Sequence, residues 1–414
     1  MALLLTHIHR LYPVATAHER LKRGADMAHA GCLENAWVQT AGAVITGFGS
    51  MASCPVPDAD TQVMDCTGRL VLPGFVDSHT HLVFPRTREG EFRDRIQGLT
   101  YEEIAARGGG ILNSARHCET LSEEALLAAA LPRAWAALRT GTTTLEIKSG
   151  YALTLEGELK LLRVARRIGE LTPLRVRTTF LGAHAIPAAY KADRQAYIDL
   201  VCDKMLPAVV AEGLADHIDV FCDRGYFTPE ETAYIMRRGA EAGLPAKIHA
   251  NELAISGGVQ VGVQQGAWSV DHLEQMDEAA ITALQGTDTI PVILPTVAFF
   301  LGIPYAPARE MIRADLPVAL ATDYNPGSSP GSSMPFVMSL ACLRQGLSPE
   351  EALIAATLNA ARALRMSDQI GAISPGRIAD ILITHPMDDL AGIPYAYAEN
   401  PVATVIIGGS VIAA

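Results

Sequence analysis

The sequence lacks the features that define several common protein classes. Aromatic residues make up only 6% of the 414 residues, and the seven cysteines are scattered and never spaced as Cys-x-x-Cys. This cysteine pattern argues against a small disulfide-stabilised fold and favours reduced thiols, most of them small core residues. Disorder is also excluded, because 49% of the residues are hydrophobic and can offset the entropy lost on folding.

Basic residues are in the minority. The chain has 33 Lys and Arg against 45 Asp and Glu, a net charge of −12, with no block of like charges. Proteins that bind nucleic acid present a basic surface to the phosphate backbone, and this composition does not offer one. We therefore expect no nucleic-acid partner.

Long apolar segments are absent too. The longest apolar stretch, around Pro291 to Pro304, is interrupted by prolines and a glycine well short of the ~20 residues that span a bilayer. The first residues, Met-Ala-Leu-Leu-Leu-Thr-His-Ile-His-Arg, have no basic segment, and their apolar run is too short for an export signal. The sequence predicts a soluble, cytoplasmic protein that does not contact membranes.

What the sequence does contain is a regular alternation of strand-like and helical segments from about Leu70 onward. Eight short runs have strand character: Val71–Asp77, Thr142–Ile147, Arg175–Phe180, His217–Phe221, Ala246–His249, Ser269–His272, Pro291–Leu294 and Pro317–Thr322. Amphipathic stretches lie between them, such as Ser122–Leu138, Leu155–Ile168, Pro229–Ala242 and Met334–Gln345. This alternation is typical of an α/β fold and favours a (β/α)8 TIM-type barrel over a doubly wound sheet.

The two ends of the chain have a different pattern. They contain short strand-like runs broken by Gly and Pro: Ala43–Thr46, Ile378–Thr384 and Val402–Ile407. Because this pattern flanks the barrel on both sides, we expect residues 1–64 and 367–414 to form one small composite β-sandwich domain. The barrel would then occupy residues 65–366.

Polar side chains gather at the predicted strand ends, where barrels build their active sites. They are His79, His81, His184, His249, Glu252, His272 and Asp323. In an extended segment residues i and i+2 point to the same side, so His79 and His81 can bind one cation together. His7 and His9 have the same spacing but no acidic partners, and we interpret them as ordinary strand or surface histidines.

Two further residues complete a possible metal site. His249 would supply a third imidazole and Asp323 a carboxylate, a set that suits Zn²⁺ or Fe with a water in an open position. Such an ion lowers the pKa of the bound water from ~15.7 toward ~7 and makes a nucleophile at neutral pH. The alternative for His249 is a core histidine whose hydrogen bonds are satisfied by the protein.

With these residues placed, the chain resembles the amidohydrolase superfamily of metal-dependent hydrolases. The resemblance lies in Asp77–Phe84, Glu146–Tyr151, Phe180–Pro187, Asp219–Asp223, His249–Glu252, Ser269–Glu274, Leu294–Val297 and Ala321–Ser328. The His-x-His pair and the aspartate at strand eight are common to the superfamily. The Lys-Ser-Gly-Tyr, Gly-Ala-His-Ala and Asp-Tyr-Asn-Pro-Gly-Ser segments are narrower and resemble the imidazolonepropionase family.

The narrower resemblance implies a reaction and a set of site residues. The reaction is the hydrolytic opening of 4-imidazolone-5-propanoate to N-formimidoyl-L-glutamate, a step of histidine degradation, on one zinc or iron ion in a homodimeric enzyme. The implied metal ligands are His79, His81, His249 and Asp323, and the other implied site residues are Arg88, Tyr151, His184, Glu252, His272, Asn325, Gly327 and Ser328. Lys148 is left out of the metal site, because its motif resembles that of relatives with a single metal.

The chemistry of these side chains suits such a reaction. The guanidinium of Arg88 can pair with a propionate, and Tyr151 and His184 can complete the pocket. Glu252 would bond a ring nitrogen of the substrate and shuttle a proton, while His272 and Asp323 orient or deprotonate the water. Which of these three groups is the general base stays open.

Simpler alternatives exist for the same residues. Arg88 could be a solvated surface arginine, Tyr151 a packed aromatic residue, and Glu252 a structural carboxylate. Asn325, Gly327 and Ser328 could serve only to form a turn. The whole chain could also be a hydrolase or deaminase for a different small heterocycle, or a catalytically inactive relative.

Overall fold

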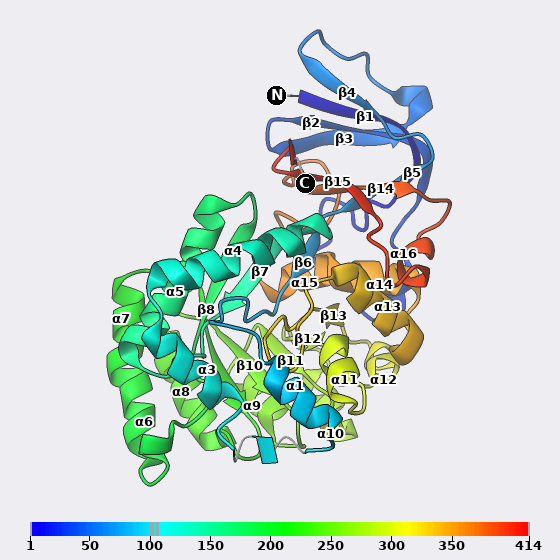
Figure 1. Ribbon diagram of the computed structural model, residues 1–414. Coiled ribbons are helices and arrows are strands. Elements are labelled where there is room, and N and C mark those ends of the chain that lie inside the picture. Colours follow the sequence, from blue (N-terminus) through cyan, green and yellow to red (C-terminus); the bar gives the residue numbers. More distant parts are fainter. Residues whose placement is uncertain (1, 100–102, 105–106, 413–414) are drawn as a thin grey trace.

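The computed structural model describes residues 2–412 except 100–102 and 105–106, and it contains two β-sheets (Figure 1). The larger part is a barrel ringed by helices. A smaller mixed sheet lies beside it, and both ends of the chain lie at this smaller sheet. Within the described ranges, no helix is long and apolar enough to cross a membrane. The fold predicted from the sequence is confirmed.

The barrel consists of eight parallel strands that pair in the order in which they occur along the chain. They are β6 (Phe75–Asp77), β7 (Thr142–Lys148), β8 (Arg175–Ala183), β9 (His217–Cys222), β10 (Ala246–Ala250), β11 (Ser269–His272), β12 (Ile290–Ile293) and β13 (Ala319–Leu320). The last strand meets the first beyond their ends, where the Asp323 amide donates to the His79 carbonyl at 3.0 Å. This contact brings the two ends of the sheet together at the face where the polar residues gather.

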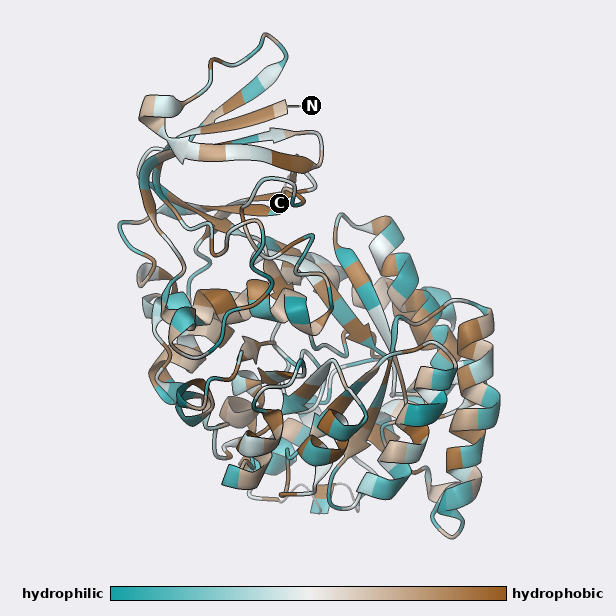
Figure 2. Ribbon diagram, turned by 180° about the vertical axis from the view of Figure 1, so that it is seen from behind, coloured by the Kyte–Doolittle hydropathy of each residue, from teal (hydrophilic) through white to brown (hydrophobic). Residues whose placement is uncertain are grey.

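Helices follow most of the strands and cover the barrel from outside. They are α1 (Glu89–Ile96), α3 (Ile111–Thr120), α4 (Glu123–Arg139), α5 (Leu155–Leu171), α6 (Arg194–Leu200), α7 (Leu206–Ala211), α8 (Pro229–Glu241), α9 (Gly258–Gln264), α10 (Glu278–Leu284), α11 (Pro295–Leu301), α12 (Ala308–Arg313), α13 (Met334–Gln345), α14 (Pro349–Ala356), α15 (Leu358–Ala363) and α16 (Gly392–Tyr395). Two of them, α8 and α14, begin with capping boxes, at Thr228 and Ser348. Apolar residues concentrate in the strands and on the inner helix faces (Figure 2).

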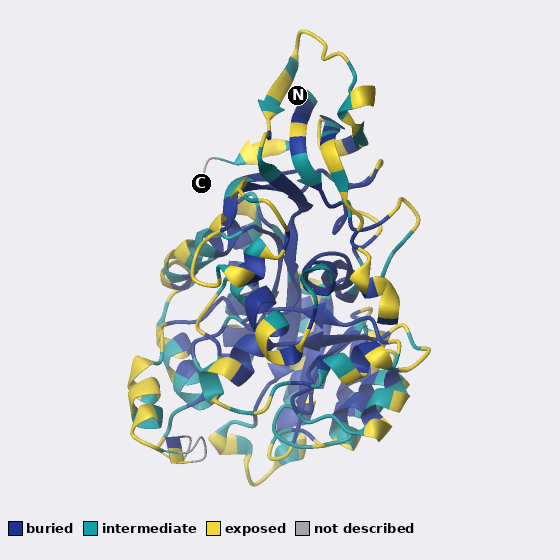
Figure 3. Cartoon of the chain, turned by 90° about the vertical axis from the view of Figure 1, so that its right-hand side faces the viewer, coloured by how far each residue is buried: buried dark blue, intermediate teal, exposed yellow. Residues whose placement is uncertain are grey.

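The smaller sheet joins both chain ends. It contains β1 (Ala2–Leu11), β2 (Leu33–Ala41), β3 (Val44–Ser50), β4 (Thr61–Asp65), β5 (Arg69–Pro73), β14 (Ile381–Pro386), β15 (Val402–Ile407) and β16 (Ser410–Ile412). Residues of the N-terminal and C-terminal strands, such as Leu5, Val38 and Ile406, share one small core. Figure 3 shows buried residues both in this sheet and through the barrel. The division into domains at residues 64 and 367 stays a prediction, and residues 1, 413 and 414 lie outside the described part.

The prediction of a single strand over residues 71–77 is wrong. The run Val71–Asp77 is two strands, β5 in the sheet of the chain ends and β6 in the barrel. Gly74 separates them, and a side chain there would overlap Thr143, so the backbone can pass only because the residue is glycine. The Gly74 amide then donates to the Asp380 carbonyl at 2.9 Å, which ties the junction to the C-terminal part of the chain.

The last barrel strand is shorter than predicted. It covers only Ala319–Leu320 instead of Pro317–Thr322. At Thr322 the backbone amide is bound by a side chain and not by a neighbouring strand. The Thr322 amide and hydroxyl both donate to the buried Asp77 carboxylate, at 3.0 and 2.6 Å. Asp323 follows with a φ of 48°, a conformation uncommon for a residue with a side chain. The turn places the Asp323 carboxylate over the mouth of the barrel.

Candidate metal centre and active-site cavity

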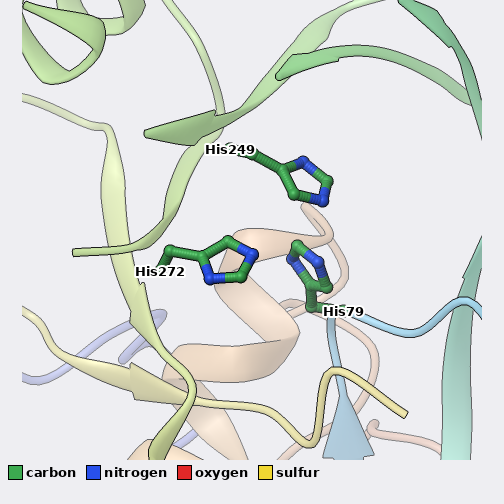
Figure 4. A group of neighbouring side chains, drawn as sticks. All are labelled: His79, His249 and His272. Carbon is green, nitrogen blue, oxygen red and sulfur yellow. The ribbon is translucent and has the colours of Figure 1, made fainter. Parts of the chain in front are cut away.

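The four predicted metal ligands lie together at the carboxyl ends of the barrel strands. His79 and His81 follow β6, His249 lies in β10, and Asp323 follows β13. Asp323 Oδ1 is 3.5 Å from the Nε2 atoms of both His79 and His81, and the Nε2 atoms of His81 and His249 are 3.3 Å apart. All four residues are buried. Figure 4 shows that His79 and His249 converge with His272 on one space.

The chemistry of these donors fits a bound cation. His79 Nε2 and Asp323 Oδ1 are buried and have no hydrogen-bond partner among the described residues. Leaving such groups unpaired costs roughly 1–3 kcal/mol each, so they mark a place where another group is expected. Burial, followed by the charge of Lys148, lowers the pKa of His79, which keeps its ring neutral and able to bind a metal.

Two buried aspartates orient the histidine ligands. Asp271 Oδ2 lies 2.6 Å from Nδ1 of His79, and Asp219 Oδ1 lies 3.1 Å from Nδ1 of His249. When Nδ1 carries the proton and bonds a carboxylate, Nε2 is left with its lone pair toward the metal. No role for Asp219 or Asp271 was predicted from the sequence. A charged residue inside an otherwise apolar strand was the signal that could have found them.

A cavity of about 290 Å³ opens above the ligands. All residues predicted from the resemblance except His79 line it: Arg88, Tyr151, His184, Glu252, His272, Asn325, Gly327 and Ser328, together with His81, His249 and Asp323. Phe221, Leu253, Leu301 and Ile303 add apolar surface. The structure therefore brings residues from distant parts of the chain to one enclosed site.

Arg88 forms one wall of the cavity. Its Nη1 is 3.5 Å from Glu91 Oε2, its side chain is only 7% exposed, and its Nε has no hydrogen-bond partner among the described residues. The guanidinium packs directly on the backbone of Gly327, where any side chain would overlap it. Arg95 also lines the cavity, with its Nη2 3.5 Å from the Gly327 carbonyl. The alternative of a solvated surface Arg88 does not fit this burial. Glu91 and Arg95 were not among the residues predicted from the sequence.

Asn325 holds the loop that carries the metal-binding aspartate. Its Nδ2 donates to Asp323 Oδ2 at 2.9 Å and to Ser328 Oγ at 2.7 Å. Its Oδ1 accepts from the amides of Gly327 and Ser328 at 2.7 and 2.8 Å. The side chain thus fixes both the second oxygen of the metal ligand and the backbone beneath Arg88.

Glu252 and His272 lie beside the cluster as an acidic and a basic group. Glu252 Oε2 is 3.7 Å from Nδ1 of His272, and Glu274 Oε2 is 3.5 Å from the same nitrogen. Burial raises the pKa of Glu252 to about 7, against the opposing charge of His272. Burial lowers the pKa of His272, but Glu252 and Glu274 outweigh it and raise the value to about 10. A carboxyl group that titrates near neutral pH is suited to proton transfer.

His184 covers the metal ligands from the side of the cavity. Its ring stacks on His81 with a centroid distance of 5.1 Å, and its Nδ1 lies 2.9 Å from the Gly150 carbonyl. Burial lowers its pKa to about 4, so the ring is neutral at physiological pH. Tyr151 follows Gly150 in the chain, and the centroid of its ring lies 5.4 Å from the ring centroids of both His81 and His184. The two residues form an aromatic wall between the ligands and Arg88.

Comparison with known proteins places the chain in a family. The model of the amidohydrolase family matches residues 70–412. An imidazolonepropionase of Flavobacterium johnsoniae is 48% identical over 412 residues and covers 100% of both chains. One of Christiangramia forsetii is 46% identical with the same coverage, and one of Geobacillus kaustophilus is 43% identical over 93% of this chain and 92% of its own.

Solved structures share the fold at much lower identity. An adenosine deaminase of Xanthomonas campestris with bound zinc has a TM-score of 0.73 at 19% identity, covering 99% of this chain and 92% of its own. A variant of atrazine chlorohydrolase from Arthrobacter aurescens, complexed with zinc and atraton, has a TM-score of 0.75 at 16% identity, covering 99% and 94%. These two likenesses show the fold. The family model and the curated relatives show that the chain belongs to the amidohydrolase family and is similar over its whole length to imidazolonepropionases.

Proposed function

We propose that this chain hydrolyses 4-imidazolone-5-propanoate to N-formimidoyl-L-glutamate. One water molecule is consumed, and a ring C–N bond of the cyclic amide breaks. The observation that carries the proposal is the cavity itself, which is lined both by three of the four candidate metal ligands, His81, His249 and Asp323, and by the buried Arg88. Such a site suits a small amide that carries a carboxylate. The identity of 43–48% to imidazolonepropionases over nearly the whole chain supports this substrate over other heterocycles.

His79, His81, His249 and Asp323 would hold one zinc or iron ion. When bound, this ion supplies a Lewis acid and a water of lowered pKa. Asp271 and Asp219 keep the imidazoles of His79 and His249 in the orientation that binding requires.

The side chains of Glu252 and His272 take part in proton transfer and charge stabilisation. The Glu252 carboxylate takes a proton from the attacking water and delivers it to the ring nitrogen that leaves. His272 lies between Glu252 and Glu274. It donates a hydrogen bond to the carbonyl oxygen of the substrate, on which negative charge develops. We assign the general base to Glu252, because its carboxyl group lines the cavity beside the metal ligands and burial raises its pKa to about 7, where it can both accept and release a proton.

Arg88 binds the propionate of the substrate and thereby positions the ring. The guanidinium already lies against Gly327 and offers a buried Nε without a partner among the described residues. His184 and Tyr151 contact the ring from the side, and Ser328 reaches the cavity from the loop that Asn325 holds. We also propose that the enzyme is a cytoplasmic homodimer that binds neither nucleic acid nor membranes.

Two measurements on the purified protein test the proposal. Elemental analysis should find one zinc or iron ion per chain, and the absorbance of imidazolonepropanoate should decay in the presence of enzyme. A panel of cyclic amides and aminated heterocycles serves as the comparison. Faster turnover of another member of the panel would refute the assigned substrate, and a metal-free protein with no hydrolase activity would favour an inactive relative.

A further inference from the structure

Beneath the metal ligands lies a layer of buried charges that the proposed reaction does not use. It consists of Glu146 and Lys148 on β7, Asp219 on β9, Lys247 on β10 and Asp271 on β11. Each of these side chains is fully buried. Three carboxylates and two ammonium groups without water would be very unfavourable unless each group met a partner. Two of the carboxylates are the ones that orient His79 and His249.

Lys148 is at the centre of this layer. Its Nζ lies 2.7 Å from Asp219 Oδ2, 3.1 Å from Glu146 Oε2 and 3.5 Å from Asp271 Oδ2. A lysine ammonium has three N–H donors and no acceptor. That of Lys148 donates hydrogen bonds to Asp219 and Glu146, and the Asp271 carboxylate lies within ion-pair distance. Among the described residues, Lys148 is the cationic side chain that pairs with both aspartates. Lys247 reaches Asp271 only at 3.8 Å and forms no ion pair with Asp219 in the described part of the chain.

The surroundings of Lys148 also bear on a different role. A lysine that carries a carbamate would place a negative charge among Glu146, Asp219 and Asp271. At these distances four anions would repel one another, and apart from a bound cation only the Lys247 ammonium in this layer would oppose their charge. The environment therefore favours a protonated ammonium over a modified metal ligand.

We propose that Lys148 is a positioning residue of the metal centre: it holds Asp219 and Asp271 in the orientation that directs Nε2 of His249 and His79 toward a single cation. The inference rests on the proposed metal site and does not depend on the identity of the substrate. Lys247 supports the same layer from the opposite side, through Glu146 Oε2 at 3.2 Å and the Ser78 carbonyl at 3.1 Å.

The test is the zinc affinity of Lys148→Met. The apo protein is titrated with Zn²⁺ in competition with a chromogenic chelator, without substrate. We expect affinity about 10- to 100-fold weaker than in the parent, the range typical of lost outer contacts of metal ligands. Lys247→Met should weaken binding less. Since no substrate is present, a failed prediction here is distinguishable from a failed assignment of the reaction.

The matched control is Asp380→Asn. Asp380 is also buried and forms a 2.6 Å ion pair with Arg175, at the junction of the barrel and the smaller sheet. This variant should lower the melting temperature while zinc affinity stays within about twofold of the parent, because the broken pair does not touch a ligand or its partners. Equal losses of zinc affinity in Lys148→Met and Asp380→Asn would overturn the positioning role.

Two further results would also overturn it. One is parental zinc affinity in Lys148→Met. The other is a second zinc per chain whose binding requires bicarbonate, which would make Lys148 a carbamate ligand. If Lys148→Met does not fold, Lys148→Gln retains a hydrogen-bond donor without the charge and takes its place. If neither folds, Lys247→Met decides, and unchanged zinc affinity in that variant refutes the role of the charged layer.

Discussion

Replacing Arg88 by Met tests how the substrate is recognised. The change removes the guanidinium while keeping a side chain of similar length against Tyr151, whose ring centre lies 5.9 Å from Arg88 Cζ. In the parent the guanidinium is mostly buried and lies against Glu91 and Gly327. The variant leaves the substrate carboxylate in the same cavity without its cationic partner.

The structure gives an expected size for the effect. Removing one partner of a buried, hydrogen-bonded charge pair costs about 2–5 kcal/mol. The pair is partly screened here, because Glu91 already lies 3.5 Å from Arg88 and must share it with the substrate. We therefore expect about 2–4 kcal/mol, which at 1.4 kcal/mol per tenfold is a fall in kcat/KM of about 30- to 700-fold.

The assay follows ring opening with two substrates. One is imidazolonepropanoate, and the other is an analogue in which the propionate is replaced by a neutral propyl or propionamide group. Arg88→Met should slow only the first, so that the two substrates become nearly equivalent. Arg86→Met is the matched control, because Arg86 is two residues away, carries the same charge and is exposed outside the cavity.

Three results would refute this reasoning. An equal fall in kcat/KM with both substrates would mean that Arg88 supports the fold of the site and does not bind the substrate carboxylate. An unchanged rate with imidazolonepropanoate would place the propionate elsewhere in the cavity. A comparable loss in Arg86→Met would mean that the long-range field of the loop matters more than contact with one side chain.

Three other predictions follow from the site. Glu252→Gln should lower kcat by about 10²- to 10⁴-fold with metal content retained. In the parent, kcat/KM should rise with pH through about 7 as Glu252 loses its proton. If Glu252→Gln showed the same rise of kcat/KM with pH, Glu252 would be excluded as the base. His249→Ala should lose its metal, and elemental analysis that found full occupancy would remove His249 from the ligand set. Gly327→Ala should displace the Arg88 guanidinium and raise KM by roughly tenfold, within the 1–3 kcal/mol typical of overpacking; a crystal structure with Arg88 unmoved and KM unchanged would contradict that packing argument.

The fold class and most of the polar residues at the barrel mouth could be predicted from the sequence. Alternating strand and helix patterns predicted the barrel, because hydrophobic periodicity is local and can be read along the chain. The same holds for the His79 and His81 pair, since two residues apart in a strand always share a face. The limits of α13 were predicted to the residue, and in the structure the helix ends where Gly346 adopts a left-handed conformation.

Other features depend on contacts between residues that are far apart in the sequence. The break at Gly74 depends on Thr143 lying against it, and the sequence around Gly74 reads as one continuous strand. The contacts of Lys148 with Asp219 and Asp271 join residues on three different strands, so their charges acquire a partner only when the barrel closes. The cause is the same in both cases, because steric exclusion and charge pairing act between atoms that are close in space. A local sequence pattern shows which residues are present, but it does not show which distant residues come into contact.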